Sequence, residues 1–191
     1  LRDGDGRILL QSNSAWRYGT GPLIYDSLRN GEIYDARLKL PWQAPEFDDS
    51  DWKHAMVVPP PGGVLEEDTA EPIEILETLP MHRTANSAVY AADENLAGHI
   101  RVTLSGPVGA KVKFRHSEFL TPSGELDTDW QQVYIKHGEF QSDCYICSGE
   151  GWEVWEPRFT YHGFQYVEVT ADDGVVIHKM EARKVGTKLT S

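Results

Sequence analysis

Carboxylates are the most numerous side chains in this sequence that could act as general acids or bases. The 191 residues include 30 Asp and Glu. Acid–base hydrolysis by two carboxylates requires a defined separation between them, and a chain with this many acids contains pairs by chance. Because carboxylates usually lie on solvated surfaces, we predict that none of them is catalytic in this chain by itself.

Histidines could supply general bases or metal ligands, and the chain has seven. None of them forms a helical His-Glu-x-x-His zinc pattern. His116 and Glu118 lie two residues apart, so on a strand they would share one face. They could pair with each other or contact a sugar, and pairing is favoured because buried polar side chains usually satisfy one another. His162 is interpreted as a structural hydrogen-bonding residue.

The two cysteines, Cys144 and Cys147, form a C-x-x-C pattern. This spacing can indicate a redox pair or half of a zinc site. Here it lies in a strand-like run, where residues three apart point to opposite faces. No second C-x-x-C completes a set of four ligands. We therefore predict a structural role, and no metal and no cofactor.

Exposed aromatic rings beside polar groups could form a platform for a sugar. Three tryptophans lie near turns and polar residues, namely Trp42, Trp130 and Trp152. Most tryptophans pack in the core or at its rim, so packing is the favoured interpretation for all three.

The stretch from Trp152 to Val169 must position several of these groups. It contains two runs rich in aromatic and β-branched residues, separated by His162 and Gly163. This pattern predicts two short strands around a bend. Gly163 is expected at the kink, because glycine adopts positive φ without a Cβ clash.

From Ile73 onward, strand-like runs alternate with turn residues at short spacing. No long segment has the 3.6-residue period of a helix. The pattern predicts an all-β fold, an antiparallel β-sandwich of the jelly-roll type with little helix. The expected strands are 73–79, 88–92, 99–104, 111–118, 141–147, 155–161, 164–170 and 175–181.

Composition excludes some classes of partner. The net charge of -12 and the pI of about 4.9 disfavour nucleic acid, which is a polyanion. No apolar run approaches the roughly 20 residues needed to span a bilayer. The chain starts with Leu and shows no signal peptide, which is typical of an internal fragment.

A change of composition predicts a domain boundary at residues 59–72. Three prolines and two glycines precede an acidic run there, which is linker chemistry. We expect residues 1–70 to be the tail of a preceding domain or a wrapping arm, and residues 71–185 to be the sandwich. Residues 186–191 would begin another linker. Within the first segment, Trp52 is expected to fold back on Phe47.

Two motifs in the expected order resemble the bacterial α-L-rhamnosidases. Residues 156–167, Glu-Pro-Arg-Phe-Thr-Tyr-His-Gly-Phe-Gln-Tyr-Val, are similar to the signature of that family's concanavalin-like domain, with a departure at Gln165. Residues 31–37, Gly-Glu-Ile-Tyr-Asp-Ala-Arg, and 47–52, Phe-Asp-Asp-Ser-Asp-Trp, resemble a second signature that precedes it. Residues 91–94 depart from another family motif. The motif positions interpreted as structural are Glu32, Tyr34, Asp35, Arg37, Arg158, Tyr161, His162, Gly163 and Tyr166.

The resemblance implies a concanavalin-like or galactose-binding-like sandwich that supports an α/α-barrel domain of the same polypeptide. In the family, that barrel carries the catalytic acids and hydrolyses terminal α-L-rhamnosyl linkages with inversion. This chain is then expected to be a non-catalytic accessory domain. One alternative is an independent module that binds rhamnose or rhamnosyl glycans, with contacts from Trp42, Trp130, Trp152, His116 and Glu118. Another is a sandwich that binds only protein.

Overall fold

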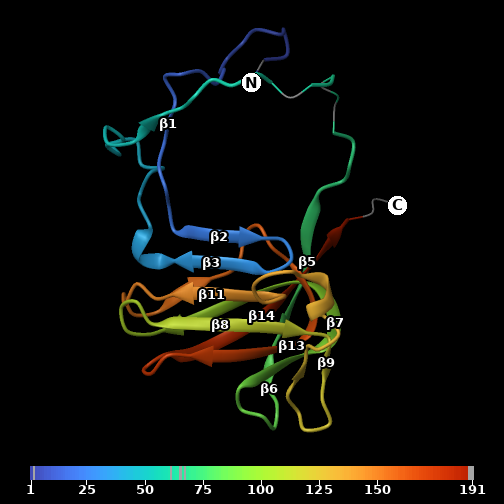
Figure 1. Cartoon of the computed structure of the whole chain (residues 1–191). Helices are drawn as coiled ribbons and strands as arrows, with labels where there is room; N and C mark the ends of the chain where they lie inside the picture. Colours follow the sequence, from blue (N-terminus) through green and yellow to red (C-terminus); the bar gives the residue numbers. More distant parts are fainter. Residues whose placement is uncertain (2, 61, 65, 67, 189–191) are drawn as a thin grey trace. The chain divides into compact units, whose positions relative to one another are not determined.

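The computed structural model describes residues 1, 3–60, 62–64, 66 and 68–188 (Figure 1). The chain forms two compact units, one from residues 1–21 and 40–69 and the other from residues 22–39 and 70–191. In the described residues, helical structure is limited to two short 3-10 turns, η1 (Ala36–Leu38) and η2 (Gln132–Tyr134). No helix in this part of the chain is long and apolar enough to cross a membrane.

The smaller unit contains one short ladder, in which β1 (Arg17–Tyr18) pairs antiparallel with β4 (Lys53–His54). The Arg17 guanidinium donates hydrogen bonds to the backbone carbonyl of Asp49 at 2.7 Å and to its carboxylate at 3.1 Å. The rings of Phe47 and Trp52 meet edge to face at 5.4 Å, which confirms the predicted contact.

A ten-stranded sheet forms the body of the larger unit (Figure 1). Its order is β2-β3-β11-β8-β13-β7-β14-β5, and β6 and β12 each pair with β7. The pairs are antiparallel except for β3 with β11, which is parallel. A separate hairpin joins β9 (Phe119–Leu120) to β10 (Leu126–Asp127). The bounds are β2 Leu23–Ser27, β3 Gly31–Asp35, β5 Ile73–Pro80, β6 His82–Arg83, β7 Val89–Ser105, β8 Lys111–Ser117, β11 Ser142–Ile146, β12 Glu153–Trp155, β13 His162–Ala171 and β14 Val176–Thr187.

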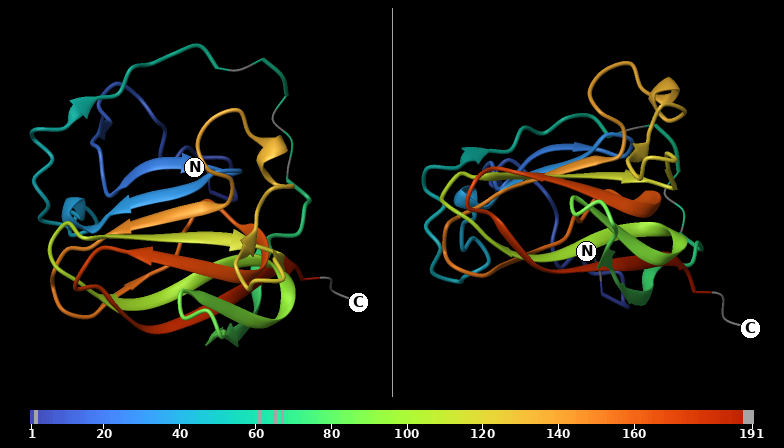
Figure 2. Two further views of the ribbon diagram at one scale, coloured as in Figure 1. Left: turned by 60° about the horizontal axis from the view of Figure 1, so that its bottom comes forward. Right: turned by 90° about the horizontal axis from the view of Figure 1, so that it is seen from below.

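The sheet curls into two facing layers, as Figure 2 shows. Its buried apolar side chains form one core. Trp155 of β12 crosses that core. Its ring lies 5.9 Å from Phe114 of β8, 5.3 Å from Tyr145 of β11 and 6.4 Å from Tyr34 of β3. Aromatic pairs at such distances add about 0.5–1.5 kcal/mol each beyond the burial of their area. The predicted all-β sandwich is therefore confirmed.

Strand alternation determines which side chains enter the core. On β8, Val112, Phe114 and His116 are fully buried, whereas Lys111, Lys113 and Arg115 are not. This alternation is the period of two that strand geometry imposes. One polar residue, His116, is thus placed among apolar inner side chains, where it needs polar partners.

Two predicted strands, 88–92 and 99–104, are joined in the single long strand β7. Asp93, Glu94 and Asn95 between them are exposed, so these polar side chains need not leave the strand. The β13 partner changes from Leu96 to Ala91 while β13 advances only from Phe164 to Tyr166. This irregularity shows that extra β7 residues bulge there, which is how a sheet bends without ending a strand.

The bend predicted at His162 and Gly163 is wrong. Both residues lie inside β13, paired with Gly98 and Ala97, and Gly163 does not have positive φ. The irregularity falls instead beside Gln165. The strand predicted over 155–161 is also wrong in extent, because β12 ends at Trp155. Pro157 follows closely and has no amide hydrogen to donate to a ladder.

Gly98 lies where the backbones of β7 and β14 approach each other closely. A Cβ at this position would overlap the backbone carbonyl oxygen of Arg183. We expect Gly98→Ala to lower the free energy of unfolding by about 3 kcal/mol, because the backbone contact cannot relax without disturbing the ladder. Urea denaturation would measure the loss.

Gly163→Ala is the matched control on the neighbouring strand. A Cβ there would meet only the Glu118 carboxylate oxygen at 3.1 Å, the end of a flexible side chain. This variant should lose less than about 1 kcal/mol. Equal losses in the two variants would contradict the proposed close approach at Gly98.

Candidate functional site

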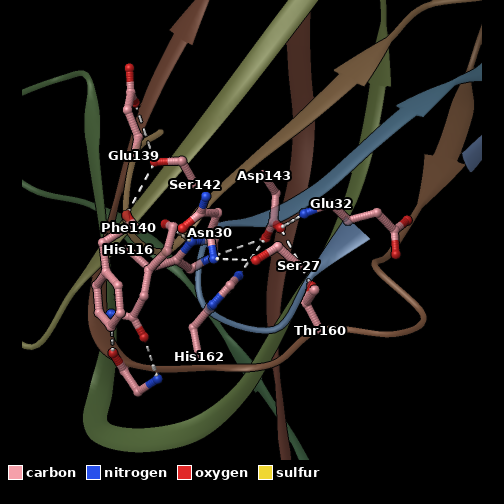
Figure 3. A network of polar contacts seen from close by, with 12 residues as sticks. Ser27, Asn30, Glu32, His116, Glu139, Phe140, Ser142, Asp143, Thr160 and His162 are labelled. Carbon is pink, nitrogen blue, oxygen red and sulfur yellow. Dashed lines mark hydrogen bonds and ion pairs between the residues drawn. The ribbon is translucent and has the colours of Figure 1, made fainter. Parts of the chain in front are cut away.

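Asp143, on β11, is the centre of a buried polar network (Figure 3). One carboxylate oxygen, Oδ2, accepts a hydrogen bond from His162 Nε2 at 2.9 Å. The other, Oδ1, accepts one from the Glu32 backbone N–H at 2.8 Å and lies 3.5 Å from the hydroxyl of Thr160. All of these groups are buried. The carboxylate therefore joins β3, β11 and the start of β13.

His116 of β8 brings a second imidazole to this carboxylate. Its Nδ1 lies 3.0 Å from the carbonyl oxygen of Gln141, and its Nε2 lies 3.8 Å from Asp143 Oδ2. The rings of His116 and His162 are 4.4 Å apart between centroids. His116 Nε2 and His162 Nδ1 are buried without a hydrogen-bond partner.

A glycine allows β3 to come this close to Asp143. Gly31 has a φ of +119°, which favours glycine. A Cβ there would meet Asp143 Oδ1 at 2.6 Å and would overlap the backbone carbonyl of Ser142. The Gly31-Glu32 pair thus delivers a backbone N–H to Asp143 at a point where a larger residue would block it.

Burial and the neighbouring charges determine the protonation of the cluster. Burial, with help from His162, lowers the pKa of His116 to about 3, so that ring is neutral near pH 7. Burial alone would raise the pKa of Asp143, but His162 and the other donors outweigh it and bring the pKa below its ordinary value. Asp143 is therefore a carboxylate held by hydrogen bonds.

Glu32 is a second buried carboxylate beside this network. Its Oε2 accepts a hydrogen bond from the Arg158 backbone N–H at 3.0 Å. Burial raises the pKa of Glu32 above its ordinary value, although the backbone donors of Arg158 and Phe159 oppose the rise. The acid thereby connects β3 to the loop between β12 and β13.

The donor atoms of the cluster form a group that could hold a metal ion. The ligand atoms of His116, Asp143 and His162 all lie within 4.8 Å of one another. The two imidazoles and one carboxylate can also act as a purely structural hydrogen-bond network. The sequence does not indicate this meeting of side chains, since it only predicts structural bonding for His162 and a partner for His116.

A surface pocket of about 530 Å³ lies elsewhere on the larger unit. Arg37, Lys39, Glu150 and Trp152 are among the residues that line it. Trp152 is 72% exposed, and its ring stacks on His178 with 4.3 Å between centroids. The pocket thus combines an open aromatic ring with charged groups.

Glu153 forms part of the wall of this pocket and is itself buried. Its carboxylate accepts hydrogen bonds from the Tyr145 hydroxyl at 2.9 Å and from the Ser148 hydroxyl and N–H at 2.7 and 2.8 Å. The Gly149 N–H adds another at 3.2 Å. Burial raises the pKa of Glu153, but these donors outweigh it and leave the pKa below its ordinary value.

The five residues predicted for sugar contact lie in unlike surroundings. Trp42 is in the smaller unit and is exposed; Trp130 is exposed, with its ring 6.1 Å from that of Phe119. Trp152 lines the pocket described above. His116 is fully buried, and Glu118 is half-buried with its carboxylate near Gly163. Their roles in sugar contact stay predictions.

The favoured pairing of His116 with Glu118 is wrong. His116 bonds to the Gln141 carbonyl instead. β8 ends at Ser117, so Glu118 does not continue the strand alternation that would put it on the same face.

Several of the motif residues interpreted as structural make contacts within the fold, and the structural role of the set stays a prediction. Arg37 forms two hydrogen bonds with the Asp35 carboxylate, at 2.9 and 2.7 Å. The ring of Tyr34 stacks on Tyr145 with 5.8 Å between centroids. The Gly163 N–H donates to the Gln141 side chain at 2.9 Å. Of the others, Glu32 and His162 bond to Asp143, and the Arg158 N–H bonds to the Glu32 carboxylate. Tyr161 is exposed, and Tyr166 is half-buried in β13.

Comparison with known families gives two adjacent matches. Residues 82–185 match the bacterial alpha-L-rhamnosidase concanavalin-like domain. Residues 1–77 match the alpha-L-rhamnosidase N-terminal domain. Together the two matches cover nearly the whole chain.

Individual relatives agree with these matches. An alpha-L-rhamnosidase of Streptomyces avermitilis is 35% identical over 173 residues, which are 86% of this chain and 16% of the relative. One from Formosa agariphila is 31% identical over 180 residues, which are 91% of this chain and 19% of the relative. The chain therefore spans less than a fifth of the length of either.

Solved structures show the same relation. An alpha-L-rhamnosidase from Dictyoglumus thermophilum matches with a TM-score of 0.81 and 35% identity, over 96% of this chain and 21% of its own. The native enzyme from Aspergillus terreus matches with a TM-score of 0.80 and 29% identity, over 97% of this chain and 22% of its own. A Streptomyces avermitilis alpha-L-rhamnosidase structure that contains L-rhamnose matches with a TM-score of 0.77 and 32% identity, over 97% of this chain and 18% of its own.

Glu153 should make the stability of the chain depend on acid pH. Its pKa is lower in the folded state than the unfolded value of about 4.3. Its stabilising contribution is therefore complete above that unfolded pKa and is lost as the pH falls through the folded pKa. Glu153→Gln should reduce the free energy of unfolding at pH 7 by about 1–3 kcal/mol.

The difference between wild type and Glu153→Gln should shrink as the pH falls below about 4.3. Urea denaturation at several pH values would measure it. Glu150→Gln, at an exposed residue of the same pocket, is the control and should change the stability little. If the difference in the free energy of unfolding between wild type and Glu153→Gln stays constant from pH 7 to pH 3, the lowered pKa assigned to Glu153 is wrong.

Proposed function

The chain belongs to the bacterial α-L-rhamnosidase family, and from this membership we propose that it is a non-catalytic accessory part of a larger α-L-rhamnosidase. The parent enzyme would hydrolyse terminal α-L-rhamnosyl linkages. This part would brace a catalytic α/α-barrel domain of the same polypeptide. The observation that carries the proposal is that the chain covers only 16–22% of each matched rhamnosidase described above, while it matches the family's N-terminal and concanavalin-like domains.

The bonding of the buried acids supports this assignment. The buried carboxylates among the described residues are Glu32, Asp35, Asp143 and Glu153. Each accepts hydrogen bonds from backbone or side-chain donors of the sandwich. Carboxylates that are hydrogen-bonded in this way connect strands and loops, and so they stabilise the fold.

Activity of the chain by itself tests the proposal. We expect the 191-residue chain, shown to be folded by a cooperative urea transition, to give no release of aglycone from an aryl α-L-rhamnoside. The reason is that hydrolysis needs a pair of carboxylates placed around a bound sugar, and the proposal assigns that pair to the barrel. Hydrolysis that remains through successive purification steps at constant specific activity would refute the accessory role.

A second candidate is carbohydrate binding by the surface pocket. The observation that favours it is Trp152, whose ring is largely exposed beside Arg37, Lys39 and Glu150. Ligand sites commonly combine apolar or aromatic walls with a few polar groups. One of the matched structures contains L-rhamnose, which suggests that sugar as the first probe.

Calorimetric titration of L-rhamnose and rhamnosyl oligosaccharides would test this second function. If Trp152 is the platform, Trp152→Ala should weaken binding by at least about tenfold, the equivalent of one lost aromatic contact of about 1.4 kcal/mol. Trp16→Ala makes the same change at an exposed tryptophan that is not among the residues predicted for sugar contact, and it should leave the affinity unchanged. Absence of heat for every sugar, or equal affinity in Trp152→Ala and wild type, would exclude the pocket as a sugar site.

A further inference from the structure

Two hydrogen-bond acceptors face each other inside the Asp143 network. His116 Nδ1 must carry the ring hydrogen, because its neighbour at 3.0 Å is the Gln141 carbonyl oxygen, which can only accept. In the neutral ring, Nε2 is then a bare lone pair. That atom is buried without a hydrogen-bond partner, and it lies 3.8 Å from Asp143 Oδ2, a second acceptor. Such an arrangement of two acceptors is unfavourable unless a cation or a hydrogen-bond donor lies between the two atoms.

We propose that one divalent transition-metal ion, for which Zn²⁺ is the best match, binds between His116 Nε2, His162 Nε2 and Asp143 Oδ2. This inference does not depend on the accessory role. Zn²⁺ holds nitrogen and carboxylate oxygen at about 2.0–2.2 Å, so neighbouring ligands of a tetrahedral ion lie about 3.3 Å apart. The separations of Asp143 Oδ2 from the two Nε2 atoms, 2.9 and 3.8 Å, lie on either side of that value.

The groups around two of the three ligands, His116 and Asp143, are arranged as those of a metal site, whereas His162 Nδ1 is buried without a hydrogen-bond partner. Histidines that bind metal usually donate their other ring N–H to a carbonyl or a carboxylate, and His116 does so to Gln141. Ligating carboxylates are also hydrogen-bonded. Asp143 receives the Glu32 N–H on Oδ1, the oxygen that the ion does not use. The ring of His116 and the carboxylate are thus oriented in advance.

The donor set selects the class of ion. Two imidazole nitrogens with one carboxylate suit Zn²⁺ and its transition-metal neighbours, whereas Mg²⁺ and Ca²⁺ are bound mainly by oxygen. All three residues are fully buried. The ion would therefore serve to link β8, β11 and β13. In the metal-free cluster His162 Nε2 donates to Asp143, so binding has to displace that hydrogen.

Metal removal and return provide the test. The chain is treated with a chelator, dialysed and titrated with ZnCl₂ in a calorimeter. We expect one equivalent to bind and Tm to rise by roughly 5–10 °C at a hundredfold excess of free zinc over Kd. His116→Gln should weaken the affinity by at least about 100-fold, since loss of an outer-shell partner alone weakens it 10–100-fold. His82→Gln, at an exposed histidine of β6, should bind as wild type does.

A cobalt titration of the unchanged chain decides the matter if His116→Gln does not fold. Co²⁺ in a four-coordinate site gives strong visible absorption bands, and these should saturate at one equivalent. Failure to take up one equivalent of Zn²⁺, weak six-coordinate cobalt bands, or equal zinc affinity in His116→Gln and wild type would each overturn the proposal. The space between His116 and Asp143 would then be assigned to a water that donates to both.

Discussion

The buried carboxylate of Asp143 is the constraint on which the larger unit depends most. Removal of an unpaired charge from water costs several kcal/mol even after the protein relaxes. The fold offsets this with donors from separate parts of the chain, namely the Glu32 N–H on β3 and the His162 ring on β13. Each donor has to arrive in one register, because a shift of one residue on a strand would turn the side chain to the opposite face. The network therefore specifies how these strands align as well as holding them together.

The aromatic core begins on the same strand, one inward position further along. Tyr145 follows Asp143 with Cys144 between them, and its ring stacks on Tyr34 of β3 and contacts Trp155 of β12. β11 thus presents a charged and an aromatic side chain to the interior in succession. The apolar contacts stabilise the fold without a preferred direction, whereas the hydrogen bonds of the charged network are directional. Both sets of contacts include residues of β3. This shared attachment explains why a strand so distant in sequence can pair in parallel with β11.

Much of this fold could be predicted from the sequence, because strand-like runs rich in β-branched and aromatic residues are separated by turn residues at short spacing. The strands over 73–79, 111–118 and 164–170 correspond closely to β5, β8 and β13. The irregularity beside Gln165 could not be predicted, since the register change depends on how β7 and β13 pair and not on a local glycine. The site was harder still. The three side chains of the cluster each point inward, two residues from an inward aromatic residue on the same strand; they are His116, Asp143 and His162. No local sequence pattern indicates that these three positions meet.

The sheet of the larger unit is built from pieces that are not contiguous in the sequence. β2 and β3, from residues 22–39, complete a sheet whose other strands begin at residue 73, while residues 40–69 belong to the other unit. A peptide-bond break within residues 40–69 would therefore leave two polypeptides held together by the β3–β11 ladder and by the Glu32 N–H on Asp143. Such a pair is a natural basis for fragment complementation, in which two separately synthesised halves recover one folded body only when mixed.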